Sequence, residues 1–152
     1  MATRPALTQH DLLRRRCASA LAHHRRRARR EGATVPYSLG ELVALAMRSP
    51  ACVHCRRPVG LDLHFDHFAP TSRGGPWELA NLGVSCPRCN WLKGKLDAQE
   101  FALLLAFLDG LHPAAAEDLM RRLLAGAKVY RGRGRGVADV PFIIFDDDGG
   151  QE

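Results

Sequence analysis

Two Cys-x-x-Cys pairs constrain the fold of this chain more than any other feature of its sequence. The first pair is Cys52 and Cys55, the second is Cys86 and Cys89, and 30 residues lie between them. Cysteine pairs of this kind are typical of structural zinc sites, in which four thiolates complete a tetrahedron around the ion. In a reducing compartment such pairs favour metal binding over disulfide formation. We therefore predict that one zinc ion ties the two ends of this segment together.

The residues between the two pairs predict a short unit of mixed secondary structure. Residues 59–68 are expected to form a strand, because apolar and polar side chains alternate along much of this stretch. Residues 70–76 are rich in glycine and proline and predict a loop. A second strand is expected at 81–85 and a helical turn at 90–93. The predicted fold class is α+β, with a small zinc-stapled core flanked by N-terminal and C-terminal helices.

The segments on either side of this core predict mainly helices. Thr8, Ser38 and Asp97 each have an acidic residue three positions later, which is the capping-box pattern of a helix start. Residues 128–136 contain an Arg-Gly repeat and predict an irregular linker, which either follows phosphates or is simply solvated. Residues 140–145 are expected to add an edge strand. We divide the chain into a basic helical N-terminal extension (1–50), the core (51–97), a helical hairpin (98–127), and a region with the Arg/Gly linker, a short strand and an acidic tail (128–152).

Positive charge is concentrated ahead of the core. Residues 1–50 contain ten arginines and three acidic residues, a balance of +7, whereas the whole chain has a net charge of +6. Many of these arginines lie around a narrow apolar stripe on the first predicted helix. The stripe is formed by Leu13, Cys17, Ala20 and His24. A basic helix beside a metal site favours a polyanionic partner such as nucleic acid, and a merely solvated helix face is the alternative. The cations predicted to contact nucleic acid are Arg14, Arg15, Arg16, Arg25, Arg26, Arg27, Arg73, Arg88, Lys93 and Lys95.

No stretch of the sequence approaches the length of a membrane span. The longest strongly apolar run is 101–108, whereas a transmembrane helix needs about 20 apolar residues. Residues 1–7 lack the apolar core of a signal peptide. We therefore expect a cytoplasmic protein without a membrane partner.

Three polar residues suit the hydrolysis of a phosphodiester. This reaction needs an activated water, stabilisation of the charge on the phosphorus, and help for the leaving oxygen, and a divalent cation supplies the last two. Mg²⁺ takes hard oxygen ligands, often only one or two from the protein, and the Asp66 carboxylate and the Asn90 amide oxygen fit this requirement. A histidine is the usual base near neutral pH, and His67 is the candidate. A turn cap at Asp66 and a helix cap at Asn90 are the structural alternatives.

The order of these motifs resembles that of the HNH endonucleases. The shared pattern is Asp66-His67-x-x-Pro70-x-Ser72-x-Gly74-Gly75, then Asn81-Leu82, and then Cys86-x-x-Cys89-Asn90-x-x-Lys93-Gly94. The resemblance covers residues 52–97 and implies the ββα-metal fold, in the subgroup that has a four-cysteine zinc site.

The resemblance also implies a role for each motif residue. Asp66 and Asn90 would bind a catalytic Mg²⁺ or Mn²⁺, and His67 would be the general base. Asn81 would not contact the metal but would hold the loop so that His67 faces the scissile phosphate. The four cysteines would hold structural zinc. Position 90 is asparagine where the family often has histidine, an H-N-N variant, so we expect activity with Mg²⁺ or Mn²⁺ and little with Ni²⁺.

The function implied by the resemblance is a metal-dependent DNA endonuclease. It would use one metal ion and a histidine base, and it would leave a 5′-phosphate and a 3′-hydroxyl. Double-stranded DNA is the expected substrate, and cleavage of both strands would need a homodimer or two visits. The expected setting is the cytoplasm of a bacterium, with a bacterial or a phage gene. The alternatives are a catalytically silent, zinc-stabilised nucleic-acid-binding module and a zinc scaffold for protein contacts. The acidic residues 146–148 would either be solvated or fold back on the basic helix.

Overall fold

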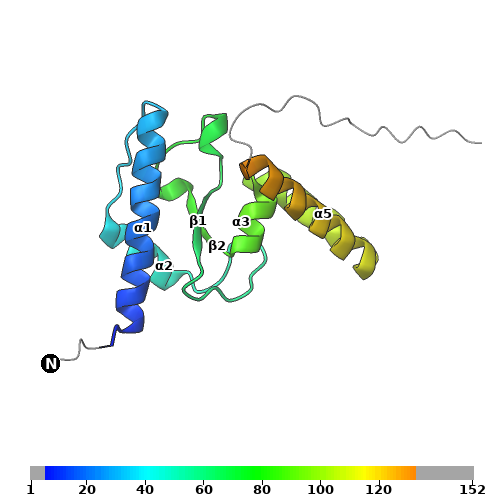
Figure 1. Ribbon diagram of the computed structural model, residues 1–152, viewed down its shortest axis with the longest axis horizontal. Coiled ribbons are helices and arrows are strands. Elements are labelled where there is room, and N and C mark those ends of the chain that lie inside the picture. Colours follow the sequence, from blue (N-terminus) through cyan, green and yellow to red (C-terminus); the bar gives the residue numbers. More distant parts are fainter. Residues whose placement is uncertain (1–5, 133–152) are drawn as a thin grey trace, which may run out of the picture.

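Five helices surround a two-stranded sheet in the computed structural model, which describes residues 6–132 (Figure 1). Two single turns of 3-10 helix, Thr71–Arg73 and Leu79–Asn81, lie in the connection between the strands. The main elements are α1 (Gln9–Arg30), α2 (Leu39–Arg48), β1 (His64–His67), β2 (Leu82–Ser85), α3 (Pro87–Lys93), α4 (Ala98–Asp109) and α5 (Pro113–Gly132).

The predicted capping boxes begin three of these helices. Thr8 caps α1, Ser38 caps α2 and Asp97 caps α4, and in each case the acidic residue three positions later accepts a hydrogen bond from the cap's backbone amide. These reciprocal bonds satisfy amides that the first turn of a helix leaves without intrahelical partners. Local interactions therefore define these helix starts.

The sheet is shorter than the sequence predicted. Strands β1 and β2 pair antiparallel over four residues, with His64 opposite Ser85 and His67 opposite Leu82. The expected strand at 59–68 was too long, because Leu61 and Asp62 form a turn instead. Alternating polarity does not distinguish a pleated strand from a turn that places successive side chains on opposite sides. The fold class, a small antiparallel sheet with flanking helices, is confirmed.

Helices α1 and α2 share one hydrophobic core with the sheet. Cys17 and Leu21 of α1 pack in a buried cluster that also contains Leu42 of α2, Phe65 of β1 and Val84 of β2. Cys17 is therefore a fully buried residue of this core. A second cluster contains Cys52, Cys89 and the α4 residue Phe101. The N-terminal helices thus pack directly on the strands that the two cysteine pairs enclose.

Helices α4 and α5 form the predicted hairpin beside α3 (Figure 1). Helix α5 extends through Gly132, so the irregular linker expected from residue 128 was wrong for 128–132. The reason is that this part of the segment contains a single glycine, at its end. The rest of the Arg-Gly repeat, the strand expected at 140–145 and the acidic residues 146–148 lie outside the described residues. Across residues 6–132, the helices lack the combination of length and apolar character that a membrane span requires.

Candidate active site between helices α1 and α3

The four paired cysteines converge on one point. Their Sγ atoms all lie within 4.8 Å of one another. Those of Cys55 and Cys86 are 3.9 Å apart. Zn–S bonds of about 2.3 Å place tetrahedral thiolates about 3.8 Å apart, so the cluster has the size of a zinc site. The Cys89 amide donates to the Cys86 sulfur, as expected where a helix begins at a metal-binding knuckle. The cluster joins the loop before β1 to the start of α3.

The predicted catalytic residues line one cavity of about 920 Å³. Its lining residues come from β1, from α1 and from α3 with the turn after it. Figure 1 shows β1 between α1 and α3, so we refer to β1 as the floor of the cavity and to the two helices as its walls. Asp66, His67 and Asn90 all contribute to the lining. Asn81 is not among the lining residues.

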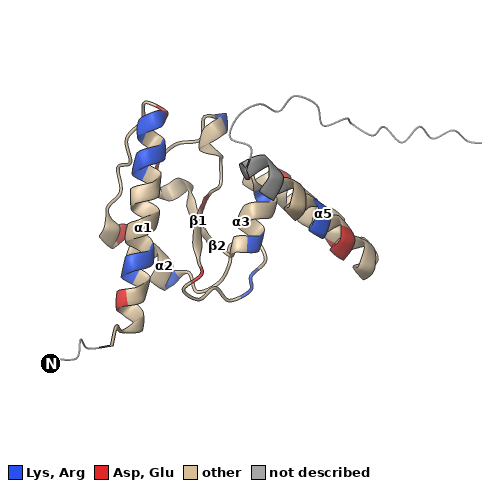
Figure 2. Ribbon diagram, viewed as in Figure 1, with Lys and Arg blue, Asp and Glu red and all other residues tan. Residues whose placement is uncertain are grey.

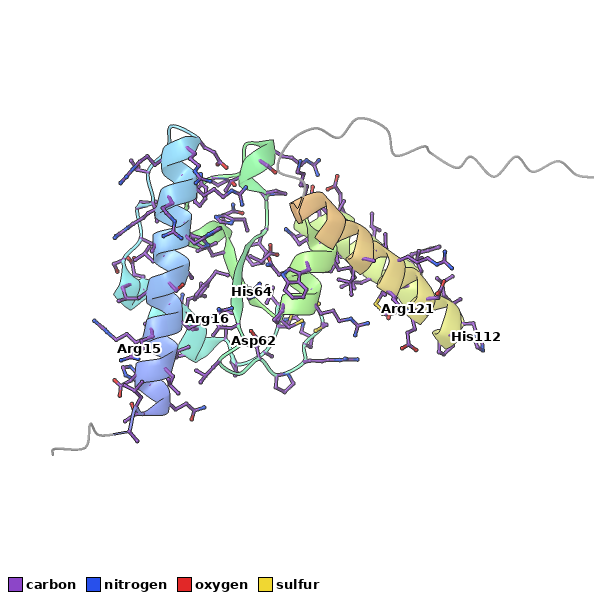
Figure 3. All side chains as sticks on the ribbon, in the orientation of Figure 1. Arg15, Arg16, Asp62, His64, His112 and Arg121 are labelled. Atoms are coloured by element: carbon purple, nitrogen blue, oxygen red, sulfur yellow. The ribbon has the colours of Figure 1, made fainter. Side chains whose placement is uncertain are left out.

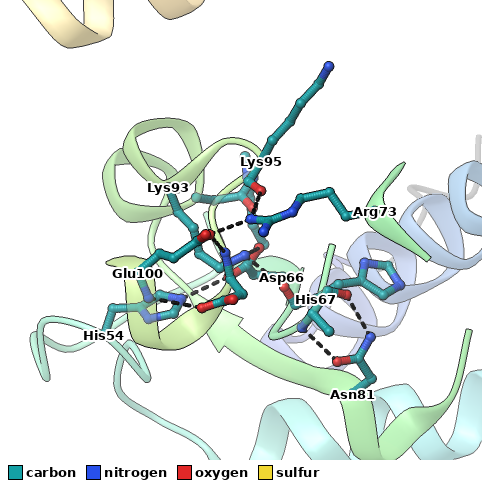
Figure 4. Close-up of polar contacts among 12 residues, drawn as sticks. His54, Asp66, His67, Arg73, Asn81, Lys93, Lys95 and Glu100 are labelled. Atoms are coloured by element: carbon teal, nitrogen blue, oxygen red, sulfur yellow. Dashed lines mark hydrogen bonds and ion pairs between the residues drawn. The ribbon is translucent and has the colours of Figure 1, made fainter. Parts of the chain in front are cut away.

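The Asp66 carboxylate accepts one hydrogen bond on each oxygen (Figure 4). The Nε2 atom of His54 lies 2.8 Å from Oδ2, and the Nζ atom of Lys93 lies 3.2 Å from Oδ1. His54 sits between the first two cysteines, and its ring packs edge-on against Phe101 at 4.9 Å. The zinc knuckle and α4 therefore both help to orient Asp66. A carboxylate oxygen has two lone pairs, so each oxygen keeps one for a cation.

Lys93 does not have the position expected of a surface phosphate contact. Its side chain is buried, and the whole residue is only 2% exposed. Its ammonium group also donates to the backbone carbonyl of His67, at 2.7 Å. A buried charge needs a partner of opposite sign, and Asp66 provides it. Lys93 thus ties α3 to the end of β1 and adds positive charge beside Asp66.

His67 lies in a cage of aromatic rings. His24 of α1 packs at 5.2 Å between ring centroids, and Trp77 packs edge-on at 4.9 Å. Burial, and then the charge of Arg27, lower the pKa of His67 to about 4. Within the described residues, its Nε2 atom is buried without a hydrogen-bond partner. With this pKa the ring is neutral at neutral pH, and a neutral imidazole keeps one nitrogen lone pair that can accept a proton.

His24 is itself held by a hydrogen bond to Tyr37. Its Nδ1 atom lies 2.6 Å from the Tyr37 hydroxyl. Burial, and then the proximity of His67, lower the pKa of His24 to about 3. Burial also raises the pKa of Tyr37 to about 12. Both partners are therefore neutral over the physiological range, and α1 supplies an uncharged polar ring next to His67.

Asn90 projects from α3 toward β1. Its Nδ2 atom lies 2.8 Å from Nδ1 of His64, two residues before Asp66 on the same strand. Side chains alternate along a strand, so His64 and Asp66 share one face. Asn90 is thereby held at the same side of β1 as the carboxylate.

Asn81 fixes the loop that follows β1 (Figure 4). Its Oδ1 atom accepts from the Ala69 amide at 2.9 Å, and its Nδ2 atom donates to the carbonyls of Ala69 and Pro76. The same loop needs Gly75, because a Cβ atom there would lie 2.0 Å from the Ala69 carbonyl oxygen. The end of β1, where His67 lies, is thus held by side-chain bonds and by close backbone packing.

The predicted nucleic-acid contacts divide into two groups. Helix α1 carries several basic residues along its length (Figure 2). Arg16, Arg26, Arg27, Lys93 and Lys95 line the cavity. The predicted contacts that do not line it are Arg14, Arg15, Arg25, Arg73 and Arg88.

Several of these arginines have partners within the protein. Arg16 donates to the Leu63 carbonyl at 3.0 Å, which ties α1 to the start of β1. Arg27 pairs with Glu31 at 3.0 Å and lies over the ring of Trp77. Arg73 donates to the Lys95 carbonyl and pairs with Glu100. Arg16, Arg27 and Arg73 therefore also have a structural role.

Sequence reasoning missed three contributors to the site. These are His54 and Trp77, for which the sequence predicted no role in the site, and His24, which was placed in the stripe of the first predicted helix. The only sequence signal for His24 was an ionisable ring on an otherwise apolar helix face. No local signal distinguished His54, because its partner Asp66 is 12 residues away and is reached only in the folded chain.

Comparison with known families agrees with the resemblance seen in the sequence. The family model described as HNH endonuclease matches residues 52–96. A comparison with curated proteins gave no match. The matched segment contains the cysteine cluster, both strands, α3 and the three residues Asp66, His67 and Asn90. Residues 52–96 of this chain therefore match the HNH endonuclease family and contain a four-cysteine cluster that could hold a metal ion.

Proposed function

We propose that this protein is a metal-dependent DNA endonuclease whose cysteine cluster holds structural zinc. The observation that carries the proposal is the convergence of Asp66, His67 and Asn90 on one cavity with cationic residues in both walls. A carboxylate, an amide and a neutral imidazole are the groups that phosphodiester hydrolysis needs around one divalent cation.

Asp66 and Asn90 would hold the cation. Both offer hard oxygen donors to the cavity, Asp66 from β1 and Asn90 from α3, and the remaining positions on the cation would be open to water and phosphate oxygens. The donor set therefore fits Mg²⁺ or Mn²⁺. When bound, the cation would supply positive charge to the phosphoryl group and to the departing 3′-oxygen.

His67 would remove a proton from the attacking water. Its neutral ring, caged by His24 and Trp77, accepts the proton, and the loop held by Asn81 keeps the ring at the end of β1. The attack of water on phosphorus breaks the bond to the 3′-oxygen and leaves a 5′-phosphate and a 3′-hydroxyl. Lys93 would keep Asp66 oriented throughout.

The cations of α1 would bind the nucleic-acid backbone. Arg26 of α1 and Lys95 after α3 are exposed and both line the cavity, so a phosphate chain that reaches His67 would pass close to positive charges. We propose duplex DNA as the substrate, and cleavage of both strands would need two copies or two visits. The expected setting is the bacterial cytoplasm.

The test is cleavage of supercoiled plasmid by zinc-loaded protein. Addition of Mg²⁺ or Mn²⁺ should produce nicked or linear DNA, and Ni²⁺ should be far less effective. His67→Ala should abolish cleavage and leave DNA binding intact, as measured by fluorescence anisotropy. His112→Ala, which changes an exposed histidine before α5, is the matched control and should cut normally. Cleavage by His67→Ala at near wild-type rate would exclude His67 as the base.

A zinc-stabilised DNA-binding module without activity is the second candidate. One observation favours it: the Lys93 ammonium and the His54 ring already occupy one position on each Asp66 oxygen. If that arrangement excluded a cation, the protein would bind DNA in the presence or absence of Mg²⁺ and cut it in neither case. Plasmid cleavage that EDTA abolishes would exclude this candidate.

A further inference from the structure

Asn90 differs from a carboxylate ligand in one physical respect. Its side chain ends in one oxygen and one nitrogen, and only the oxygen binds a cation. Rotation of the amide by half a turn would present two N–H donors to the cation and abolish binding. An asparagine ligand therefore needs a neighbour that recognises its nitrogen.

His64 lies where such a neighbour is needed. Its Nδ1 atom is 2.8 Å from Nδ2 of Asn90, and both residues line the cavity. The ring also packs edge-on toward Trp91, with the centroids 6.2 Å apart. Figure 3 places His64 between β1 and α3. His64 lies outside the motif residues that carry the family resemblance.

The hydrogen bond has a defined direction. The Asn90 amide nitrogen can only donate, so Nδ1 of His64 must accept, and the ring proton must lie on Nε2. With its nitrogen engaged, the amide directs Oδ1 away from His64. Ligand orientation by such outer hydrogen bonds is a general feature of metal sites.

We infer that His64 is a positioning residue that holds the amide oxygen of Asn90 toward the catalytic cation. The inference rests on the proposed function and adds a residue to it. His64 does not bind the cation in this arrangement, because its Nδ1 lone pair is used by Asn90.

The test is Mn²⁺ binding to zinc-loaded protein without DNA, followed by electron paramagnetic resonance. His64→Ala should weaken Mn²⁺ binding about 10- to 100-fold, the usual effect of losing an outer-shell partner. His64→Gln, whose side-chain oxygen can accept from Asn90, should restore much of the affinity. Zinc content and circular dichroism should remain unchanged.

Asn90→Asp is the matched background. Both ends of a carboxylate are oxygens, so orientation no longer matters, and His64→Ala should cause little further loss of Mn²⁺ affinity in that background. Equal losses in the wild-type and Asn90→Asp backgrounds, or no loss in either, would overturn the role of His64. If His64→Ala does not fold, the comparison of His64→Gln with the similar-sized His64→Leu provides the same test.

Failure of the proposed function would give a different result. If Asp66→Ala and Asn90→Ala bind Mn²⁺ as the wild type does, or if the wild type binds none, both the cation site and the role of His64 are wrong. If these two variants lose Mn²⁺ and His64→Ala does not, only the role of His64 is wrong.

Discussion

Replacement of Lys93 by methionine should destabilise the protein more than any exposed lysine replacement. The ammonium group is buried between α3 and the end of β1, where it donates to Asp66 and to the His67 carbonyl. Methionine has a similar length and is apolar. Among the residues that the structure describes, the change therefore leaves the Asp66 carboxylate, itself only 7% exposed, with His54 as its side-chain partner.

The expected magnitude follows from the cost of a buried charge without its counterion. Removal of one partner of a buried ion pair typically costs about 3–5 kcal/mol. The loss of a donor to the His67 carbonyl acts in the same direction. For a chain of this size, each kcal/mol corresponds to about 2–4 °C in the melting temperature. We therefore expect Lys93→Met to lower the melting temperature by about 10 °C.

The assay is urea unfolding in a buffer of fixed zinc concentration, because zinc binding contributes to the measured stability. Lys95→Met, at an exposed position two residues later, is the matched control and should change the unfolding free energy by less than about 0.5 kcal/mol. The double variant Asp66→Asn/Lys93→Met removes both charges and should recover most of the loss.

A loss below about 1 kcal/mol for Lys93→Met would refute the reasoning, because it would mean that the Asp66 carboxylate does not depend on the ammonium group. A double variant as unstable as Lys93→Met would refute it in another way. In that case the cost would come from packing and not from the unpaired charge.

Two further predictions concern the loop after β1 and the ring cage. Gly75→Ala should lower the unfolding free energy by about 3 kcal/mol or more, because the new Cβ would lie 2.0 Å from the Ala69 carbonyl oxygen. Gly60→Ala is the control in the same urea assay, because a Cβ at position 60 would have no atom within 4 Å. Burial first, and then neighbouring charges, lower the pKa of His24 to about 3 from an ordinary value of 6.5. Below pH 6.5 the unfolded chain binds a proton that the folded ring does not, so stability falls with acidification, by about 2 kcal/mol from this group between about pH 7.5 and pH 5. His24→Phe should remove this part of the slope in urea unfolding measured across that range, and an unchanged slope would show that His24 titrates normally in the folded protein.

The features that the sequence predicted correctly depend on interactions between residues that are close together in the chain. The capping boxes at Thr8, Ser38 and Asp97 begin helices because each satisfies amides within its own first turn. Cysteine spacing predicted the four-sulfur cluster for a similar reason, since two residues between thiols place both on one knuckle. The length of β1 was not predicted, because alternating polarity also occurs in the turn at Leu61 and Asp62.

The electrostatic setting of the site was not predictable in the same way. Lys93 looked like a surface cation, yet it is buried against Asp66, which is 27 residues away in the chain. Nothing in the sequence assigned His54 a role in the site, yet it also holds Asp66. Whether a side chain is buried, and which residue it pairs with, depend on how distant segments of the chain pack together. The spacing of residues along the sequence carries little information about this packing.

By itself, the sequence determined the α+β class, the cysteine cluster, the starts of three helices and the resemblance of one segment to the HNH endonucleases. These depend on short-range geometry and on motifs within residues 52–96. Only the tertiary structure decided that α1 forms a wall of the cavity, that His24 packs on His67, and that His54, His64 and Lys93 surround the proposed cation ligands. The physical reason is that α1, α2 and the sheet bury their apolar side chains in one shared hydrophobic core. Polar groups at the edge of this core lose contact with water, so each pairs with a residue that the packing of these elements brings close.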